Sequence, residues 1–143
     1  EENKIRDLEK MVQTITKGLI IIGVIQLLII VFFGKYILNI WGSDFVDAYW
    51  VLVILSFGQF VNISTGAAGL LLVMTNNERI QTKISISTVI LAILMWIIFI
   101  PTLGVVGAAI STAFIVIYEN LSRVFYSKKI INVMTVPIKF NQS

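Results

Sequence analysis

An uncharged run from Ile84 to Tyr118 constrains this chain more than any other feature. One membrane crossing takes about 20 mostly apolar residues, so a run of this length holds two crossings. The run is interrupted once, at Pro101–Gly104, where proline removes a backbone donor and glycine permits a turn. We therefore predict two membrane-spanning helices, at about 82–100 and 105–125, joined by a tight turn.

The composition indicates a membrane protein and excludes several kinds of chemistry. The chain has 143 residues, of which 57% are hydrophobic and 13% charged, whereas soluble domains carry about 25% charged residues. It has no cysteine and no histidine. Disulfides, thiolate sites, the commonest metal ligand and the commonest general base are therefore excluded. We expect no catalytic constellation, no cofactor and no metal site, and hence no enzyme activity.

Two further spans are predicted nearer the N-terminus, at about 18–38 and 48–75. The second exceeds what the hydrocarbon layer needs, so we expect a tilt or a break in it. Residues 1–17 have helical apolar periodicity and many charges, which predicts an amphipathic helix. Its apolar stripe is Ile5, Leu8, Val12, Ile15 and Leu19. This helix either extends the first span into the cytoplasm or lies in the membrane interface.

The predicted fold class is an all-α membrane protein with four transmembrane helices after a cytoplasmic amphipathic helix. Residues 18–126 form the transmembrane bundle, and residues 127–143 form a cytoplasmic tail that is too short and too broken to span. The chain begins without methionine, and we expect it to be a piece of a longer membrane protein.

Polar residues inside the spans are the candidates for a substrate path. Gln26 lies near the middle of the first span, where an amide either bonds to another helix or faces substrate. Gln59, Asn62 and Gly66, together with Gly69, follow a spacing that places them on one helix face. That face either packs closely against a neighbouring helix or borders a polar cavity.

The last span combines small residues with one ion pair. Gly107, Ala109, Ser111 and Ala113 lie in its first turns and predict close helix packing. Glu119 lies four residues before Arg123, the favourable order for a pair on one helix.

The loop charges predict the orientation. Ten lysines and arginines fall on one predicted side of the membrane and one, Lys35, on the other. The ten are Lys4, Arg6, Lys10, Lys17, Arg79, Lys83, Arg123, Lys128, Lys129 and Lys139. The positive-inside rule therefore places both termini and the 76–83 loop in the cytoplasm of a multi-pass plasma-membrane protein.

The cytoplasmic cations allow two interpretations. They either orient the protein and attract anionic lipid, or they make a first contact with the pyrophosphate of a lipid-linked substrate. For the second role, the headgroup candidates are Arg79, Lys83 and Arg123.

Three stretches, in chain order, resemble motifs of polysaccharide-biosynthesis exporters. Ile37–Phe45, followed by Ala48 and Val51–Leu52, resembles the apolar run that precedes a span in that family. Leu70–Arg79 is similar to a cytoplasmic turn of the family, with Asn76 near a position where glycine is common. Ile100–Ala113 resembles a hairpin of the form I-P-x-x-G-x-x-G-A-A-x-A-T, the most specific of the three.

The resemblance implies the C-terminal four-helix portion of a flippase in the multidrug/oligosaccharidyl-lipid/polysaccharide exporter superfamily. Such proteins have roughly 12 to 14 helices in two bundles around a central cavity. They flip undecaprenyl-pyrophosphate-linked oligosaccharide from the cytoplasmic to the outer leaflet for surface polysaccharide biosynthesis. The implied partners are the lipid bilayer, the lipid-linked oligosaccharide and the remaining helices of the parent transporter; nucleic acid is not among them. The alternatives are a multidrug or lipid exporter of the same superfamily and a non-transporting membrane scaffold.

Overall fold

The computed structural model describes residues 2–137, with side chains from residue 7 onward. This part of the chain consists of helices and short turns and contains no strand. Three helical stretches are long and apolar enough to cross a membrane: Asp7–Trp41, Ser43–Ser64 and Glu78–Ile131. The predicted all-α class is confirmed at this level.

Helix α1, Glu2–Trp41, is continuous, so residues 2–17 extend the first predicted span as part of the same helix. Gly18 stays helical, and no other helix breaker stands near it. Ile5 lies outside the described side chains. Of the other residues in the predicted stripe, Val12 is buried, whereas Leu8, Ile15 and Leu19 are exposed. The stripe is therefore not the face of α1 that packs against the rest of the chain.

The predicted span at 48–75 contains a break, one of the two outcomes expected for its length, and forms two helices. A 3₁₀ helix, η1 (Ser43–Ala48), leads into α2 (Tyr49–Ser64), and α3 (Ala68–Met74) follows after a break. Gly66 has a φ of 66° within this break. This left-handed conformation interrupts the helix and suits glycine, which has no Cβ.

Helix α4, Glu78–Tyr126, reverses direction at Gly104, where φ is 57° and ψ is −133°. We call residues 78–103 its first limb and residues 105–126 its second limb. The predicted hairpin is therefore present, but the first limb begins before residue 82 and continues through Pro101. Pro101 lies within the last turn of the first limb. Gly104 is the one residue within α4 that has a positive φ, so the non-helical backbone of the turn is confined to this glycine.

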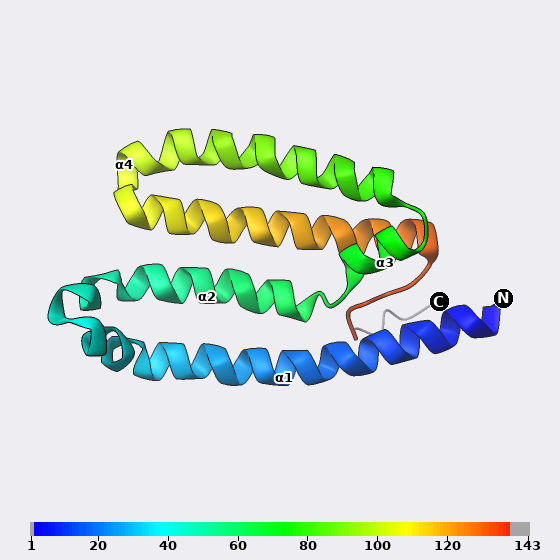
Figure 1. Ribbon diagram of the computed structural model, residues 1–143, viewed down its shortest axis with the longest axis horizontal. Coiled ribbons are helices and arrows are strands. Elements are labelled where there is room, and N and C mark those ends of the chain that lie inside the picture. Colours follow the sequence, from blue (N-terminus) through cyan, green and yellow to red (C-terminus); the bar gives the residue numbers. More distant parts are fainter. Residues whose placement is uncertain (1, 138–143) are drawn as a thin grey trace, which may run out of the picture.

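The helices lie side by side in one row (Figure 1). Helix α1 packs against α2, and α2 packs against the second limb of α4, while the first limb forms the far edge (Figure 1). Within the described residues, α1 does not touch α4. The turn at Gly104 and η1 lie at one end of the row, which we call the turn end (Figure 1).

Small residues permit close packing in the middle of the row. A Cβ built on Gly58 of α2 would lie 3.0 Å from the Cα of Ala113 in the second limb. A Cβ on Gly107 would collide with the carbonyl oxygen of Phe99 in the first limb. Ser111 Oγ also reaches the Met95 carbonyl oxygen across the hairpin, at 3.4 Å. The predicted small-residue packing of the last span is confirmed.

The segment after α4 does not form a free tail. A π-helical turn, η2 (Ser127–Ile131), continues α4, and Asn132 with a φ of 58° then turns the chain back. Residues 132–137, which we call the strap, cross the end of the row opposite Gly104. We call this the strap end; it also carries α3 and the start of α1 (Figure 1). The remainder of the predicted tail, with Lys139, lies outside the described residues.

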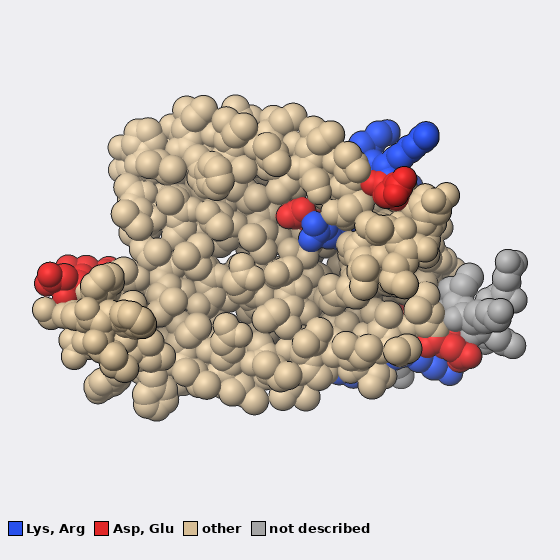
Figure 2. Space-filling model, viewed as in Figure 1, with Lys and Arg blue, Asp and Glu red and all other residues tan. Residues whose placement is uncertain are grey.

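Most large apolar side chains face outward instead of into a core. Exposed examples occur along every long helix, among them Ile21, Phe32, Phe57, Ile97 and Phe125. On the face in Figure 2, Lys and Arg gather toward the strap end, the turn end shows only Asp or Glu, and a wide uncharged band lies between. Exposed apolar surface on this scale is typical of membrane insertion.

Candidate functional site at the break between α2 and α3

The break between α2 and α3 belongs to a set of buried polar side chains from five parts of the chain. The set comprises Thr16 of α1, Thr65 of the break, Asn120 of α4, Ser127 of η2 and Thr135 of the strap, all at most 5% exposed. Buried polar groups are costly unless they are hydrogen-bonded. Within the described residues, no buried side-chain nitrogen or oxygen lacks a partner. The set therefore holds the strap end in one arrangement.

Thr65 is the centre of these hydrogen bonds. Thr135 Oγ1 donates to the Thr65 carbonyl oxygen at 2.7 Å, which satisfies an acceptor that the end of α2 leaves open. The Thr65 hydroxyl lies 2.8 Å from the Asn62 carbonyl oxygen and 3.2 Å from Asn120 Oδ1. The strap thus supplies one bond that an unbroken helix would have made internally, and α4 adds a contact to the Thr65 side chain.

Helix α1 holds the strap from the other side. Glu9 Oε1 accepts a hydrogen bond from the Met134 backbone N–H at 3.0 Å. Gln13 Nε2 donates to the Met134 carbonyl oxygen, also at 3.0 Å. Val133 and Thr135, on either side of Met134, are fully buried. The strap therefore joins α1 to α2, which are the first helices of the chain.

Gly66 lies directly against Thr16 of α1. A Cβ built on Gly66 would overlap Thr16 Oγ1, and the φ of 66° already disfavours any other residue. Thr16 Oγ1 donates to the Val12 carbonyl oxygen at 2.8 Å, so its orientation is fixed. Gly66, which was predicted to border the substrate path, therefore packs against α1.

The other path candidates are only partly brought together. Asn62 Nδ2 donates to Gln59 Oε1 at 3.2 Å on the exposed side of α2. Gln26 is exposed on α1 and has no hydrogen bond to them among the described side chains. The predicted common face does not extend to Gly69, because its spacing requires an unbroken helix and the chain breaks at Gly66.

Arg123 has partners of its own. Its Nη2 donates to Glu119 Oε1 at 2.5 Å, and the two side chains are 23% and 22% exposed, so the predicted ion pair is confirmed. The Gln81 amide oxygen faces the guanidinium, because the opposite orientation would set donor against donor. It then accepts from Nη2 at 3.0 Å and from Nε at 3.3 Å. Gly69 leaves room for this arginine, since a Cβ there would lie 3.1 Å from Arg123 Cδ.

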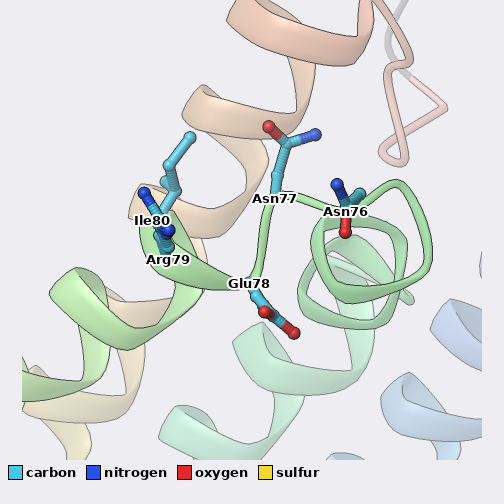
Figure 3. A pocket seen from close by; sticks show the side chains of 5 residues that line it. All are labelled: Asn76, Asn77, Glu78, Arg79 and Ile80. Carbon is cyan, nitrogen blue, oxygen red and sulfur yellow. The ribbon is translucent and has the colours of Figure 1, made fainter.

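Arg79 lies beside the connection between α3 and α4. A hollow of about 480 Å³ is lined by Asn76, Asn77, Glu78, Arg79 and Ile80. Their side chains point in different directions around the connection (Figure 3), so the hollow is an open surface and not a converging site. Asn76 adopts a φ of 63°, the conformation that glycine would supply, and Asn tolerates it better than most residues.

Lys83 lies in a second hollow, between the two limbs of α4. Its volume is about 360 Å³, and its lining is Ile80, Lys83, Ile84, Ser87, Tyr118, Ser122 and Tyr126. Four of these residues carry hydroxyls. We call this hollow the hydroxyl groove. Of the three predicted headgroup residues, Lys83 is the one placed in a groove with converging polar groups.

The sequence analysis missed Thr16, Asn120 and Thr135. Single threonines and asparagines in helices carry no pattern of their own, and their importance arises from contacts between residues far apart in the chain. One signal was available: residues 132–136 contain no charge, which is unusual for a cytoplasmic tail and typical of a buried segment.

No family model matches this chain, and no curated protein or solved structure matches it either. The exporter motifs therefore remain a resemblance.

Proposed function

We propose that this chain belongs to a transporter that flips undecaprenyl-pyrophosphate-linked oligosaccharide across the plasma membrane for surface polysaccharide biosynthesis. The observation that carries the proposal is the break at Gly66. Helix α2 and the preceding η1 make a stretch, Ser43–Ser64, that is long enough to cross the membrane. The break follows directly at the strap end of this span, and interrupted helices commonly mark transport sites.

In this proposal α1, α2 and the two limbs of α4 cross the membrane, which makes four spans. The strap end, with both termini, faces the cytoplasm. The gathering of lysine and arginine toward the strap end supports this orientation through the positive-inside rule (Figure 2).

The polar residues then have defined roles. Gln59 and Asn62 border the substrate path, Gln26 approaches it from α1, and Gly66 gives the break its shape. Arg79, Lys83 and Arg123 supply cations near the cytoplasmic headgroups, with Arg123 the most constrained because Glu119 and Gln81 occupy its donors. The single row of helices cannot enclose a large substrate, so helices beyond those described complete the path by alternating access.

A strain without the gene tests this function. Lipid-linked glycan should accumulate facing the cytoplasm, and the intact gene should restore its transfer. A Gln59→Leu, Asn62→Leu double variant should transfer less than the wild type at equal abundance. Normal transfer in the deleted strain would contradict the proposal, and efflux of drugs coupled to sodium or protons would favour an exporter with another cargo.

A non-transporting membrane scaffold is the second candidate. The single row of helices favours it, because the described residues surround no channel (Figure 1). For a scaffold, deletion should leave glycan transfer intact while a partner membrane protein loses abundance, as measured by quantitative proteomics of the membrane fraction.

A further inference from the structure

The hydroxyl groove combines one ammonium group with hydroxyls from both limbs of α4. Lys83 and Ser87 come from the first limb, and Tyr118, Ser122 and Tyr126 come from the second. Ser87 Oγ and Tyr118 OH lie 3.3 Å apart and join the limbs. The groove volume of about 360 Å³ is within the range of small-molecule sites.

The groove is rich in donors without partners. Among the described side chains, the only ion pair joins Arg123 to Glu119, so Lys83 keeps an uncompensated charge. Ser87 donates to the Ile84 carbonyl oxygen at 2.7 Å, whereas Ser122 and Tyr126 have no side-chain hydrogen bond within the described part of the chain. An ammonium group beside unpartnered hydroxyls suits an anion with several acceptor oxygens, and a phosphate has this form.

An apolar surface continues from the groove toward the turn end. Ile90 and Leu94 lie two and three helical turns beyond Lys83 and are 57% and 53% exposed. On the second limb, Phe114 lies one turn from Tyr118 and is 49% exposed. A ligand that fits both surfaces has a phosphate head and a long apolar chain.

We propose that the hydroxyl groove binds the phosphate headgroup of a membrane lipid whose chain lies along Ile90, Leu94 and Phe114. Binding requires only that α4 is inserted in the membrane, and it is independent of whether the protein transports anything. Two lipid classes carry this chemistry, an anionic glycerophospholipid and a polyprenyl pyrophosphate. If the second is preferred, the groove is a contact for the proposed transport substrate, and this conclusion rests on the proposed function.

Native mass spectrometry of the complete protein in detergent tests the site. Phosphatidylglycerol, a polyprenyl pyrophosphate and uncharged diacylglycerol are added in separate series. We expect the wild type to retain at least one phosphate lipid and to release diacylglycerol. Lys83→Gln should bind that lipid about tenfold more weakly, because a charge-assisted contact is lost. A Tyr118→Phe, Ser122→Ala double variant should weaken binding by a smaller factor.

Two controls separate local from general effects. Lys17→Gln removes the same charge from an exposed position on α1, at the opposite edge of the row, and should bind like the wild type (Figure 1). Lys83→Arg keeps the positive charge and should retain most of the wild-type affinity for the phosphate lipid. Equal retention by Lys83→Gln and Lys17→Gln, or equal retention of diacylglycerol, would overturn the proposal. A Lys83→Gln protein that binds weakly yet melts like the wild type would support it.

Discussion

Individual glycines in this protein have different physical reasons for being glycine. Gly66 needs a positive φ and also lacks room for a Cβ beside Thr16. Gly104 needs only the positive φ, because a Cβ there would meet nothing within 4 Å. Gly58 is helical but lies against the backbone of Ala113. Gly18 has neither constraint, so it provides an internal control for the others.

Gly66→Ala should destabilise the protein by about 1–3 kcal/mol, because alanine would be strained at this φ and would contact Thr16. Gly18→Ala should have no cost or a slight gain, since alanine favours the helix. Thermal unfolding of the purified protein measures both. Adding Thr16→Ala to Gly66→Ala should recover only the steric part of the loss. Equal melting temperatures for Gly66→Ala and the wild type would show that the break adopts another conformation.

For individual residues, contacts between residues close in the sequence were predictable, and contacts between residues far apart in the sequence were not. The Glu119–Arg123 pair follows from a four-residue spacing on one helix, and the structure contains it. The bond from Thr135 to Thr65 spans 70 positions of the chain and depends on how whole helices are placed. No local pattern of residue types specifies a contact of that kind.

Among the elements, the strap and the break depend on each other. Thr135 satisfies the carbonyl oxygen of Thr65, while α1 holds the strap through Glu9 and Gln13. The backbone groups that a break in a buried helix leaves open must be satisfied by protein or water. The strap therefore stabilises the break, and loosening it should loosen the ends of α2 and α3.

Thr135→Val should destabilise the protein by about 1–3 kcal/mol, because it leaves the buried carbonyl oxygen of Thr65 without its donor. Thr14→Val is the matched control, since Thr14 is exposed and donates only to the Lys10 carbonyl oxygen within its own helix. Limited proteolysis after residue 127 measures release of the strap, and it should be faster in Thr135→Val alone. Similar cleavage of both variants would contradict a latching role for Thr135.

The hairpin of α4 can be tested with introduced cysteines, because the chain has none of its own. Ser87→Cys with Tyr118→Cys should react with a bifunctional thiol reagent about as long as a tyrosine ring, since Ser87 Oγ and Tyr118 OH lie 3.3 Å apart and the reagent spans the length that the lost ring occupied. Thr14→Cys with Ser87→Cys should not react within one molecule, because α1 and the first limb lie at opposite edges of the row (Figure 1). Mass spectrometry of the linked peptides gives the result. A straight α4 would leave the first pair unlinked.

The described residues form a single layer of helices (Figure 1) whose surface carries many exposed apolar side chains. The middle of the row is tightly packed where Gly58 meets Ala113, but α1 and the first limb lie at the edges of the row, each beside one long helix or limb (Figure 1). Lipid or further helices must therefore cover most of the surface. In the proposed transporter, a layer of this kind would form one wall of the path and not the whole path.

The orientation of this layer is testable with single cysteines. Ser43 at the turn end and Thr82 near the strap end are both exposed. In intact cells, a membrane-impermeant thiol reagent should label Ser43→Cys, and Thr82→Cys should react only after the membrane is opened. The opposite result would reverse the orientation, and labelling of both from outside would contradict a crossing between them.

The sequence predicted the apolar spans, the hairpin and the small-residue packing, because each follows from a local pattern of hydrophobicity or size. It did not locate the break at Gly66, because a glycine in an apolar stretch is compatible with both a helix and a turn. It also treated the strap as a tail, since burial of Val133 and Thr135 depends on contacts with distant parts of the chain that local patterns do not describe.

The strap also constrains the order in which the tertiary contacts of the protein can form during synthesis. Met134 bonds to Glu9 across 125 positions of the chain, so the ribosome must synthesise nearly all of the described residues before this contact can form. Until then, α1 and α2 can associate only through their own interface, and the polar groups around Thr65 must be satisfied by water or other partners. We therefore expect closure of the strap end to be a late, post-insertion step, because contacts between distant residues carry the largest loop-closure entropy.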